Sequence, residues 1–229
     1  MPNPRELRLM SEFEGLKALH TRYSLFNFYC ADLTSKEATA LLMGNLSPVE
    51  LADFLPPEEF EKRYPGMPPE KYLIFYDCVG IEEAEDGTLK TVARHAMEVI
   101  FGWHYPAERP NFIWLTNIWH PNFKGRFICI EGRPFAVGLT LSQIVPEVGR
   151  MIQYQNYNVK DPLNRAAAEW THLHEHLLPI DDRDILDSRR LVGRRLQDTQ
   201  AGEEPLIQII SENAEPDTLI ELVDSEPDK

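Results

Sequence analysis

The chain has few cysteines and no apolar leader. Its 229 residues include three cysteines, Cys30, Cys78 and Cys129, and no two of them are close in the sequence. This spacing excludes a disulfide framework and a CxxC metal knuckle, and it favours a reducing compartment, the cytoplasm. No stretch is apolar over the length of a signal core or a membrane span. We therefore expect a soluble protein that is not exported and has no membrane partner.

Positive charge is also scarce. The 23 lysines and arginines face 37 aspartates and glutamates, which gives a formal net charge of −14. Binding to nucleic acids draws on clustered basic side chains, so nucleic acid is not expected as a ligand. Residues 203–229 alone contain nine acidic side chains and one lysine. The acidity therefore belongs mainly to a C-terminal tail.

Apolar periodicity predicts three main helices. The first covers residues 4–20 and places Glu12 among its polar positions. The second follows a capping box that begins at Thr140. The third begins with Asp161 as its N-cap and continues to Leu177.

Three stretches between the first two helices predict strands. Residues 71–81 alternate, with Tyr72, Ile74, Tyr76 and Cys78 on one side, and residues 89–103 and 111–117 are also β-prone. Turn sequences separate the three stretches, which predicts an antiparallel meander covered by helices on one face, and hence an α+β fold.

Residues 24–69 read as an insertion before the first of these strands. They suggest two short helices, over residues 34–43 and 47–54, and Pro56 and Pro57 open a proline-rich run that should break further regular structure. The main domain is expected to cover residues 1–180. Residues 181–229 are expected to form one more helix and the acidic tail.

A candidate active site lies at residues 120–130. It joins the turn triplet His120-Pro121-Asn122, a short loop with a single glycine, and Cys129 between two isoleucines. A cysteine placed so can be an exposed nucleophile, with the Asn122 amide close enough to donate a hydrogen bond to an oxyanion. A buried core strand explains the same string, because cysteine is among the most buried residue types. The local sequence alone favours the core strand.

Residues 71–178 nevertheless resemble a ubiquitin-conjugating enzyme. Three motifs and the cysteine follow one another in that family's order: Tyr105-Pro106-Ala107-Glu108-Arg109-Pro110, His120-Pro121-Asn122, Cys129, and Asp161-Pro162-Leu163. The resemblance implies a ubiquitin-conjugating-like fold, a four-stranded antiparallel meander with an N-terminal helix and C-terminal helices, here with a helical insertion before the first strand. Residues 157–170 look most like the prokaryotic branch, found in bacterial modification systems, several of which defend against phage.

The resemblance also implies roles for individual residues. Cys129 would accept the C-terminal acyl group of a ubiquitin-like protein as a thioester and pass it to an amine. Asn122 would stabilise the oxyanion or brace the loop, and Asp161 would orient the incoming lysine or take its proton, unless it serves only as a helix cap. Structural roles at the site are expected for His120 and Pro121. The first helix would receive the activating enzyme through Arg5, Arg8 and Lys17, although a solvated polar face is the simpler explanation for each of these residues taken singly.

Two further features concern binding: three histidines that do not form a metal site, and two apolar segments of the tail that suggest a contact with a partner protein. His172, His174 and His176 lack the spacing of a metal site, so neither a metal nor another cofactor is expected. The tail contains two β-prone apolar quartets with acidic flanks, and we hypothesise that they add a strand to the modifier. Disorder, or packing on the chain's own surface, is the simpler alternative. The tail residues concerned are Ile207, Ile209, Ile210, Leu219, Ile220, Leu222 and Val223.

The favoured function is therefore that of a ubiquitin-like protein conjugating enzyme. Its partners would be a ubiquitin-like modifier, an activating enzyme and a target protein, and such systems also contain an isopeptidase. The alternative is a catalytically inert adaptor of the same fold that binds the modifier or the activating enzyme. The joint presence of Cys129, Asn122 and Asp161 favours the enzyme, and an unrelated α+β binding domain is a third interpretation.

Overall fold

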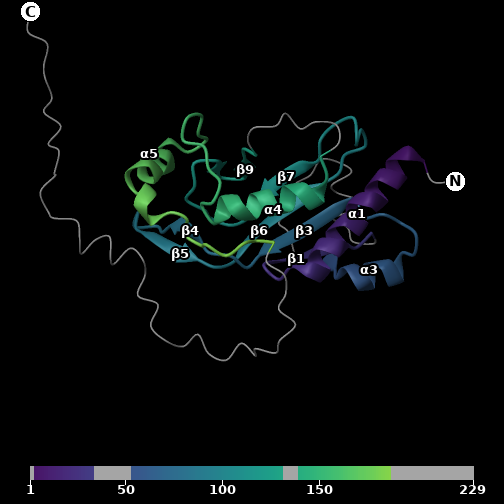
Figure 1. Ribbon diagram of the computed structural model, residues 1–229. Coiled ribbons are helices and arrows are strands. Elements are labelled where there is room, and N and C mark those ends of the chain that lie inside the picture. The colour runs from purple at the N-terminus through teal and green to yellow at the C-terminus, as the bar shows by residue number, and fades with distance from the viewer. Residues whose placement is uncertain (1–2, 34–52, 131–138, 187–229) are drawn as a thin grey trace, which may run out of the picture.

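The computed structural model describes residues 3–33, 53–130 and 139–186. Its centre is a five-stranded antiparallel sheet in the order β2-β1-β3-β6-β7 (Figure 1). The strands are β1 (Phe26–Ala31), β2 (Phe54–Leu55), β3 (Lys71–Tyr76), β6 (His95–Ile100) and β7 (Asn111–Trp114). Two small hairpins accompany this sheet, β4 (Gly80–Glu83) with β5 (Leu89–Val92), and β8 (Phe123–Lys124) with β9 (Phe127–Ile128). The predicted α+β class with an antiparallel sheet is confirmed.

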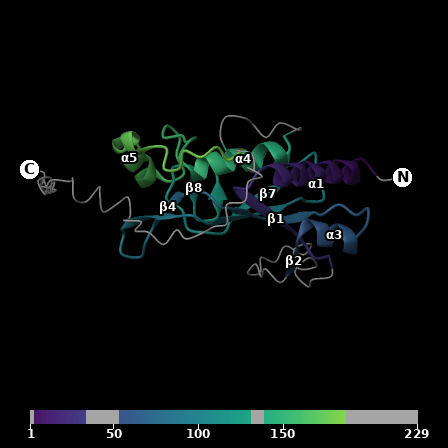
Figure 2. The same cartoon turned by 60° about the horizontal axis from the view of Figure 1, so that its bottom comes forward.

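Helices α1 (Pro4–Arg22) and α4 (Leu141–Ile152) cover one face of the sheet, and α3 (Pro57–Arg63) contacts β1 (Figure 2). Helix α5 (Arg165–Leu173), followed by a 3-10 turn at Glu175–Leu177, lies beyond the end of α4 (Figure 1). The apolar stripes of α1 and α4 pack with alternate residues of β1, β3 and β6 into one core. Tyr72, Ile74, Tyr76 and Cys78 all point into this core, as their alternation predicts. No helix within the described ranges has the length and apolar character needed to cross a membrane.

The insertion does not precede the first strand. β1 lies within the residues assigned to it and pairs with β3 in the register Phe26↔Tyr76 to Cys30↔Tyr72. Phe26, Phe28 and Cys30 are buried in the core, and Asn27 and Tyr29 between them are partly exposed, so β1 is a full member of the sheet. The proline run was also misread, because Pro56 is the N-cap of α3 and Pro57 its first residue, where a missing amide costs least. The helices predicted over residues 34–43 and 47–54 fall almost wholly outside the described residues, and Phe54 belongs to β2.

For two of the three helices, the start observed in the structure agrees with the start predicted from the sequence. Asn3 caps α1, and Thr140 caps α4 by donating its amide to the Gln143 side chain at 3.0 Å. The third helix begins at Arg165 instead of after Asp161, because the cap is Asn164, whose side chain accepts from the Ala167 amide at 3.2 Å. It also ends early, at Leu173.

Glu12 is buried, against the expectation that it lies on the polar side of α1. Its carboxylate accepts from the Tyr105 hydroxyl and from the Leu141 amide, both at 2.7 Å, and pairs with Arg8 at 2.9 Å. Since the Leu141 amide is one of the orphan donors at the start of α4, Glu12 fastens α1 to α4.

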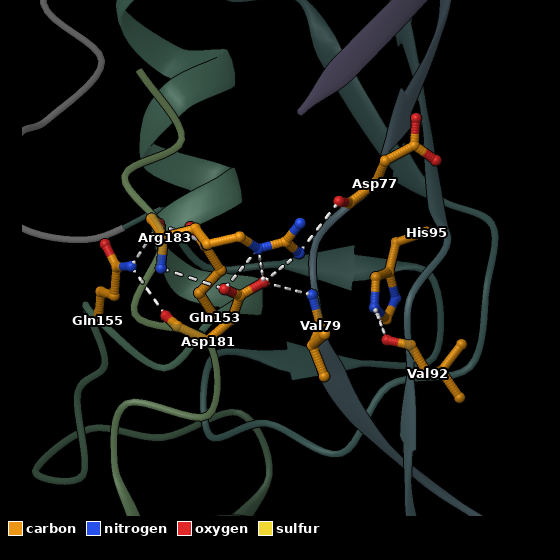
Figure 3. A network of polar contacts seen from close by, with 8 residues as sticks. All are labelled: Asp77, Val79, Val92, His95, Gln153, Gln155, Asp181 and Arg183. Carbon is orange, nitrogen blue, oxygen red and sulfur yellow. Dashed lines mark hydrogen bonds and ion pairs between the residues drawn. The ribbon is translucent and has the colours of Figure 1, made fainter. Parts of the chain in front are cut away.

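A short C-terminal strap, residues 180–186, closes the described core. The Asp181 carboxylate accepts from the Val79 amide at 2.8 Å and from the Arg183 guanidinium at 2.6 Å (Figure 3). Gln153, at the end of α4, donates to the Arg183 carbonyl at 2.7 Å. Ile185 is fully buried and lies so close to Gly149 that a Cβ there would come within 2.6 Å of it. The strap therefore joins α4 to the turn between β3 and β4.

We expect Asp181→Ala to lower the free energy of unfolding by about 1–3 kcal/mol, because the Val79 amide loses its buried acceptor and Arg183 its partner. Urea unfolding at neutral pH measures the change. The matched control is Asp182→Ala, which removes an exposed carboxylate next to it in the chain. Equal stabilities of the two variants would show that the strap contributes nothing.

Candidate active site

The β8–β9 hairpin sets the geometry around Cys129. Phe123 pairs with Ile128 and Lys124 with Phe127, around a turn in which Gly125 takes φ 56°. The Cys129 amide then donates to the Asn122 carbonyl at 2.8 Å, which extends the same register by one pair. Asn122 and Cys129 therefore lie opposite each other, with Cα atoms about 5.5 Å apart and side chains on the same face of the ladder.

Cys129 is the cysteine that solvent can reach. It is partly exposed, and no disulfide engages it. Cys30 and Cys78 are fully buried, and burial raises the pKa of both thiols, that of Cys78 to about 12. Because the thiolate is the nucleophile, these two buried cysteines are inert. Cys129 does not occupy the core strand that its local sequence favours.

The Asn122 side chain is buried and only half satisfied. Its Oδ1 accepts from the Asn158 amide at 2.8 Å, which fixes the orientation of the side-chain amide, since only the oxygen can accept. Its Nδ2 is buried and has no hydrogen-bond partner among the described residues. An unpaired buried donor is unfavourable and requires an explanation. A donor held in this state on the face of the thiol suits an oxyanion that forms only during a reaction.

His120 holds the turn and is not a base at neutral pH. It is fully buried, and its Nδ1 accepts from the Asn122 amide at 3.1 Å, so Nδ1 carries no proton. Burial lowers the pKa of His120 to about 3. The ring packs edge-on against Phe123 and Tyr154. His120 therefore fixes the backbone of Asn122.

Asp161 lies exposed in a loop, and the triplet His120-Pro121-Asn122 holds this loop at both ends. Asn122 binds the Asn158 amide, and the Pro121 carbonyl accepts from the Asn164 amide at 3.0 Å. Between these points the Asn158 side chain accepts from the Lys160 amide at 2.7 Å and from the Asp161 amide at 3.4 Å. The hydrogen bonds thus run from Cys129 through Asn122 and Asn158 to Asp161. Asn158 was missed as a site residue, although an asparagine in a loop often accepts from the amide two residues ahead, as Asn158 does from Lys160, in an Asx turn.

The three basic residues assigned to the activating enzyme are bonded within the chain. Arg5 binds Glu70 through two contacts at 2.7 and 2.8 Å, Arg8 pairs with Glu12, and Lys17 pairs with Glu61 at 2.9 Å. They lie on α1, whereas Cys129, Asn122 and Asn158 come from the β8–β9 hairpin and the loop before α5. The structure does not bring them together with Cys129.

The histidines near the end of α5 have ordinary surroundings. His174 stacks on Trp170 with ring centroids 4.7 Å apart, and His172 contacts Glu175 at 3.2 Å. The described part of the chain contains no group of three His, Cys, Asp or Glu side chains that could hold a metal ion. The seven tail residues, Ile207 to Val223, lie outside the described residues, as does most of the helix expected after Asp184.

Comparisons with known proteins bear on the fold. No family model matches the chain, and neither does any curated protein. Among solved structures the chain is similar to Ubc12 of Saccharomyces cerevisiae (17% identity, 81% of this chain and 77% of that one, TM-score 0.46). It is also similar to the domain of a Toxoplasma gondii ubiquitin-conjugating enzyme (18%, 47% and 73%, TM-score 0.36) and to a protein described as a novel ubiquitin-conjugating enzyme (15%, 75% and 87%, TM-score 0.44). At these values the likeness concerns the backbone alone.

Proposed function

We propose that this protein is a ubiquitin-like protein conjugating enzyme that carries the modifier as a thioester on Cys129. The observation that carries the proposal is the pair formed by a partly exposed thiol and a buried amide opposite it, whose Nδ2 has no partner among the described residues. A core cysteine has no need for such a donor. An inert adaptor has no need for it either.

The chemistry consists of two acyl exchanges. The Cys129 thiolate attacks the carbonyl carbon of the thioester on the activating enzyme, and the thiol of that enzyme leaves. An amine of the target then attacks the new thioester, its carbonyl oxygen gains negative charge, and the Cys129 thiolate leaves as the amide forms. In both steps the Asn122 Nδ2–H donates to the oxyanion. The amine loses one proton, and the carboxylate of Asp161 is the candidate acceptor or orienting group.

The chemistry requires an activating enzyme, a ubiquitin-like modifier and a target protein as partners. The family resemblance suggests an isopeptidase as a further member of the same system. The cytoplasm and a bacterial defence system remain the proposed setting. Docking of the activating enzyme through Arg5, Arg8 and Lys17 would have to replace their ion pairs with Glu70, Glu12 and Glu61. Residues 205–226 are proposed as a second, non-covalent contact with the modifier.

Reconstitution tests the proposal. The wild-type chain is incubated with ATP and with the activating enzyme and modifier encoded beside it, and the products are separated without reducing agent. We expect a one-to-one adduct that a thiol reagent releases and that peptide mapping assigns to Cys129. An activating enzyme that becomes charged while this chain never acquires the adduct would contradict the enzyme and support the inert adaptor.

Asn122→Asp should slow the transfer from a preformed thioester to free lysine by about 100- to 1,000-fold, the usual cost of one oxyanion donor. This variant keeps an oxygen that accepts from the Asn158 amide but lacks the Nδ2 donor. Single-turnover discharge measures the rate.

The control for loop bracing is Asn158→Ala, which removes the acceptor for the Lys160 and Asp161 amides and leaves Asn122 unchanged. If bracing were the sole role of Asn122, Asn122→Asp would discharge at nearly the wild-type rate and Asn158→Ala would be slow.

A further inference from the structure

The outer face of the β8–β9 hairpin continues directly from the thiol. Because side chains alternate along the ladder, Phe123 and Ile128 point inward, and both pack with the core. Lys124 and Phe127 form the next pair on the same face as Asn122 and Cys129. The Cα atoms of Phe127 and Cys129 are two residues apart on an extended chain, which is about 6–7 Å. Phe127 is therefore the neighbour of the candidate nucleophile.

Phe127 is among the most exposed large apolar side chains described, with 74% of its surface accessible. On the other side of Cys129 the same face is closed, because Asn122 is fully buried and bonds the loop that carries Asp161. Among the described residues, an incoming chain thus meets Phe127 before it reaches the thiol. A single exposed aromatic residue is ordinary elsewhere on a surface, but this one borders a reacting group.

Cations surround this ring in a strongly acidic protein. Lys124 lies across the ladder from Phe127 and Arg126 occupies the turn, and both are exposed. Neither forms an ion pair with another residue in the parts of the chain that the structure describes. By contrast, Arg5, Lys17 and Lys90 are each paired with a glutamate. Within the described residues the hairpin therefore presents two positive charges without ion-pair partners and an apolar ring beside Cys129.

We infer that the β8–β9 hairpin selects the acceptor: Phe127, Lys124 and Arg126 bind a target segment that carries an apolar side chain and carboxylates next to the acceptor lysine. The ring takes the apolar side chain, and the two cations attract the carboxylates and discriminate against basic segments. This inference rests on the proposed function, because it assigns the substrate class of the same site. It makes Phe127 a specificity-determining residue and gives it no part in the acyl exchange.

Binding to the uncharged full-length chain tests the inference without any thioester. Two peptides of equal length share a central lysine and a neighbouring leucine, and differ in that the flanking positions are glutamate in one and arginine in the other. Titration followed by NMR should show that the acidic peptide binds at least about tenfold more tightly and perturbs the hairpin amides. Phe127→Ala and the double variant Lys124→Glu, Arg126→Glu should each lose most of this preference.

Lys90→Glu is the control on a different hairpin: it reverses one cation, where the double variant reverses two, and it should bind like the wild type. Equal affinity for the two peptides in the wild type would overturn the inference, whether or not Cys129 carries a modifier. A Phe127→Ala chain that binds the acidic peptide normally but is loaded slowly by the activating enzyme would also overturn it, and would assign the ring to the donor side. Selective binding of the acidic peptide by a chain that never forms an adduct would support the hairpin site and contradict only the conjugating function.

Discussion

Cys129→Ala is expected to abolish the modifier adduct completely. The variant has no thiol that solvent can reach, because Cys30 and Cys78 are fully buried. Cys129→Lys should behave differently. An amine at this position can accept the acyl group as an amide, so the adduct should form slowly and resist thiol reagents, whereas the wild-type thioester is released by them. Non-reducing and reducing electrophoresis of the three proteins after the same reaction distinguish these outcomes.

Cys78→Ala provides the control for general damage to the fold. It removes a core thiol whose pKa burial raises to about 12, so its stability should fall but its adduct should form as in the wild type. An adduct that persists in Cys129→Ala, or that disappears in Cys78→Ala while the fold is retained, would contradict the assignment of Cys129.

The sequence predicted the fold where periodicity and turn chemistry agree. Helix α1, helix α4 and the alternation of β3 required no knowledge of distant contacts. β1 was missed because its partner β3 lies far along the chain, and only this pairing shows that the alternating Phe26, Phe28 and Cys30 form a strand. Such a pairing depends on contacts between residues far apart in the chain, which local patterns do not report.

The start of α5 was wrong for a related reason. Asp161 and Asn164 are both good caps, and tertiary contacts decided between them. The Pro121 carbonyl and the Asn122 side chain hold the backbone at Asn164 and Asn158, which keeps the residues between them out of the helix. The loop that carries Asp161 therefore owes its shape to the triplet beside Cys129.

The candidate site was predicted as residue types but not as geometry. The local sequence offered Cys129 and Asn122 as a candidate pair but favoured a core strand, and the resemblance reversed that preference. Their opposition across the ladder follows from the hairpin register, and the unpaired Nδ2 follows from the contact with Asn158. The burial of Glu12 was not predicted for the same reason, since helical periodicity cannot show that its carboxylate will contact Tyr105 and the start of α4. These features depend on three-dimensional neighbours.

Acid is expected to destabilise the protein between pH 6.5 and pH 4.5. Burial lowers the pKa of His95 to about 4 and that of His120 to about 3, against an ordinary value of 6.5. Both rings are fully buried, and His95 donates from Nε2 to the Val92 carbonyl at 3.0 Å (Figure 3). Between pH 6.5 and pH 4.5 the unfolded chain binds protons at both positions while the folded chain remains mostly unprotonated there. The free energy of unfolding should therefore fall as the pH falls through this window.

The expected loss between pH 7 and pH 4.5 is about 2.5 kcal/mol for each histidine, or about 5 kcal/mol together, which is comparable with the whole stability of many domains. The protonation of Asp181 changes the free energy of unfolding only below this pH window. Burial raises the pKa of its carboxyl, but the hydrogen bonds from Arg183 and Val79 outweigh burial and leave that pKa below the ordinary 3.8. Urea unfolding at the two pH values measures the loss. His95→Leu should reduce it by about half, whereas His172→Gln, at an exposed ring, should leave it unchanged. A wild-type stability that stays level down to pH 4.5 would show that both rings bind protons in the folded state, and would remove the neutral His120 that holds Asn122 opposite Cys129. A His95→Leu chain with the full loss would show that His95 does not contribute to it.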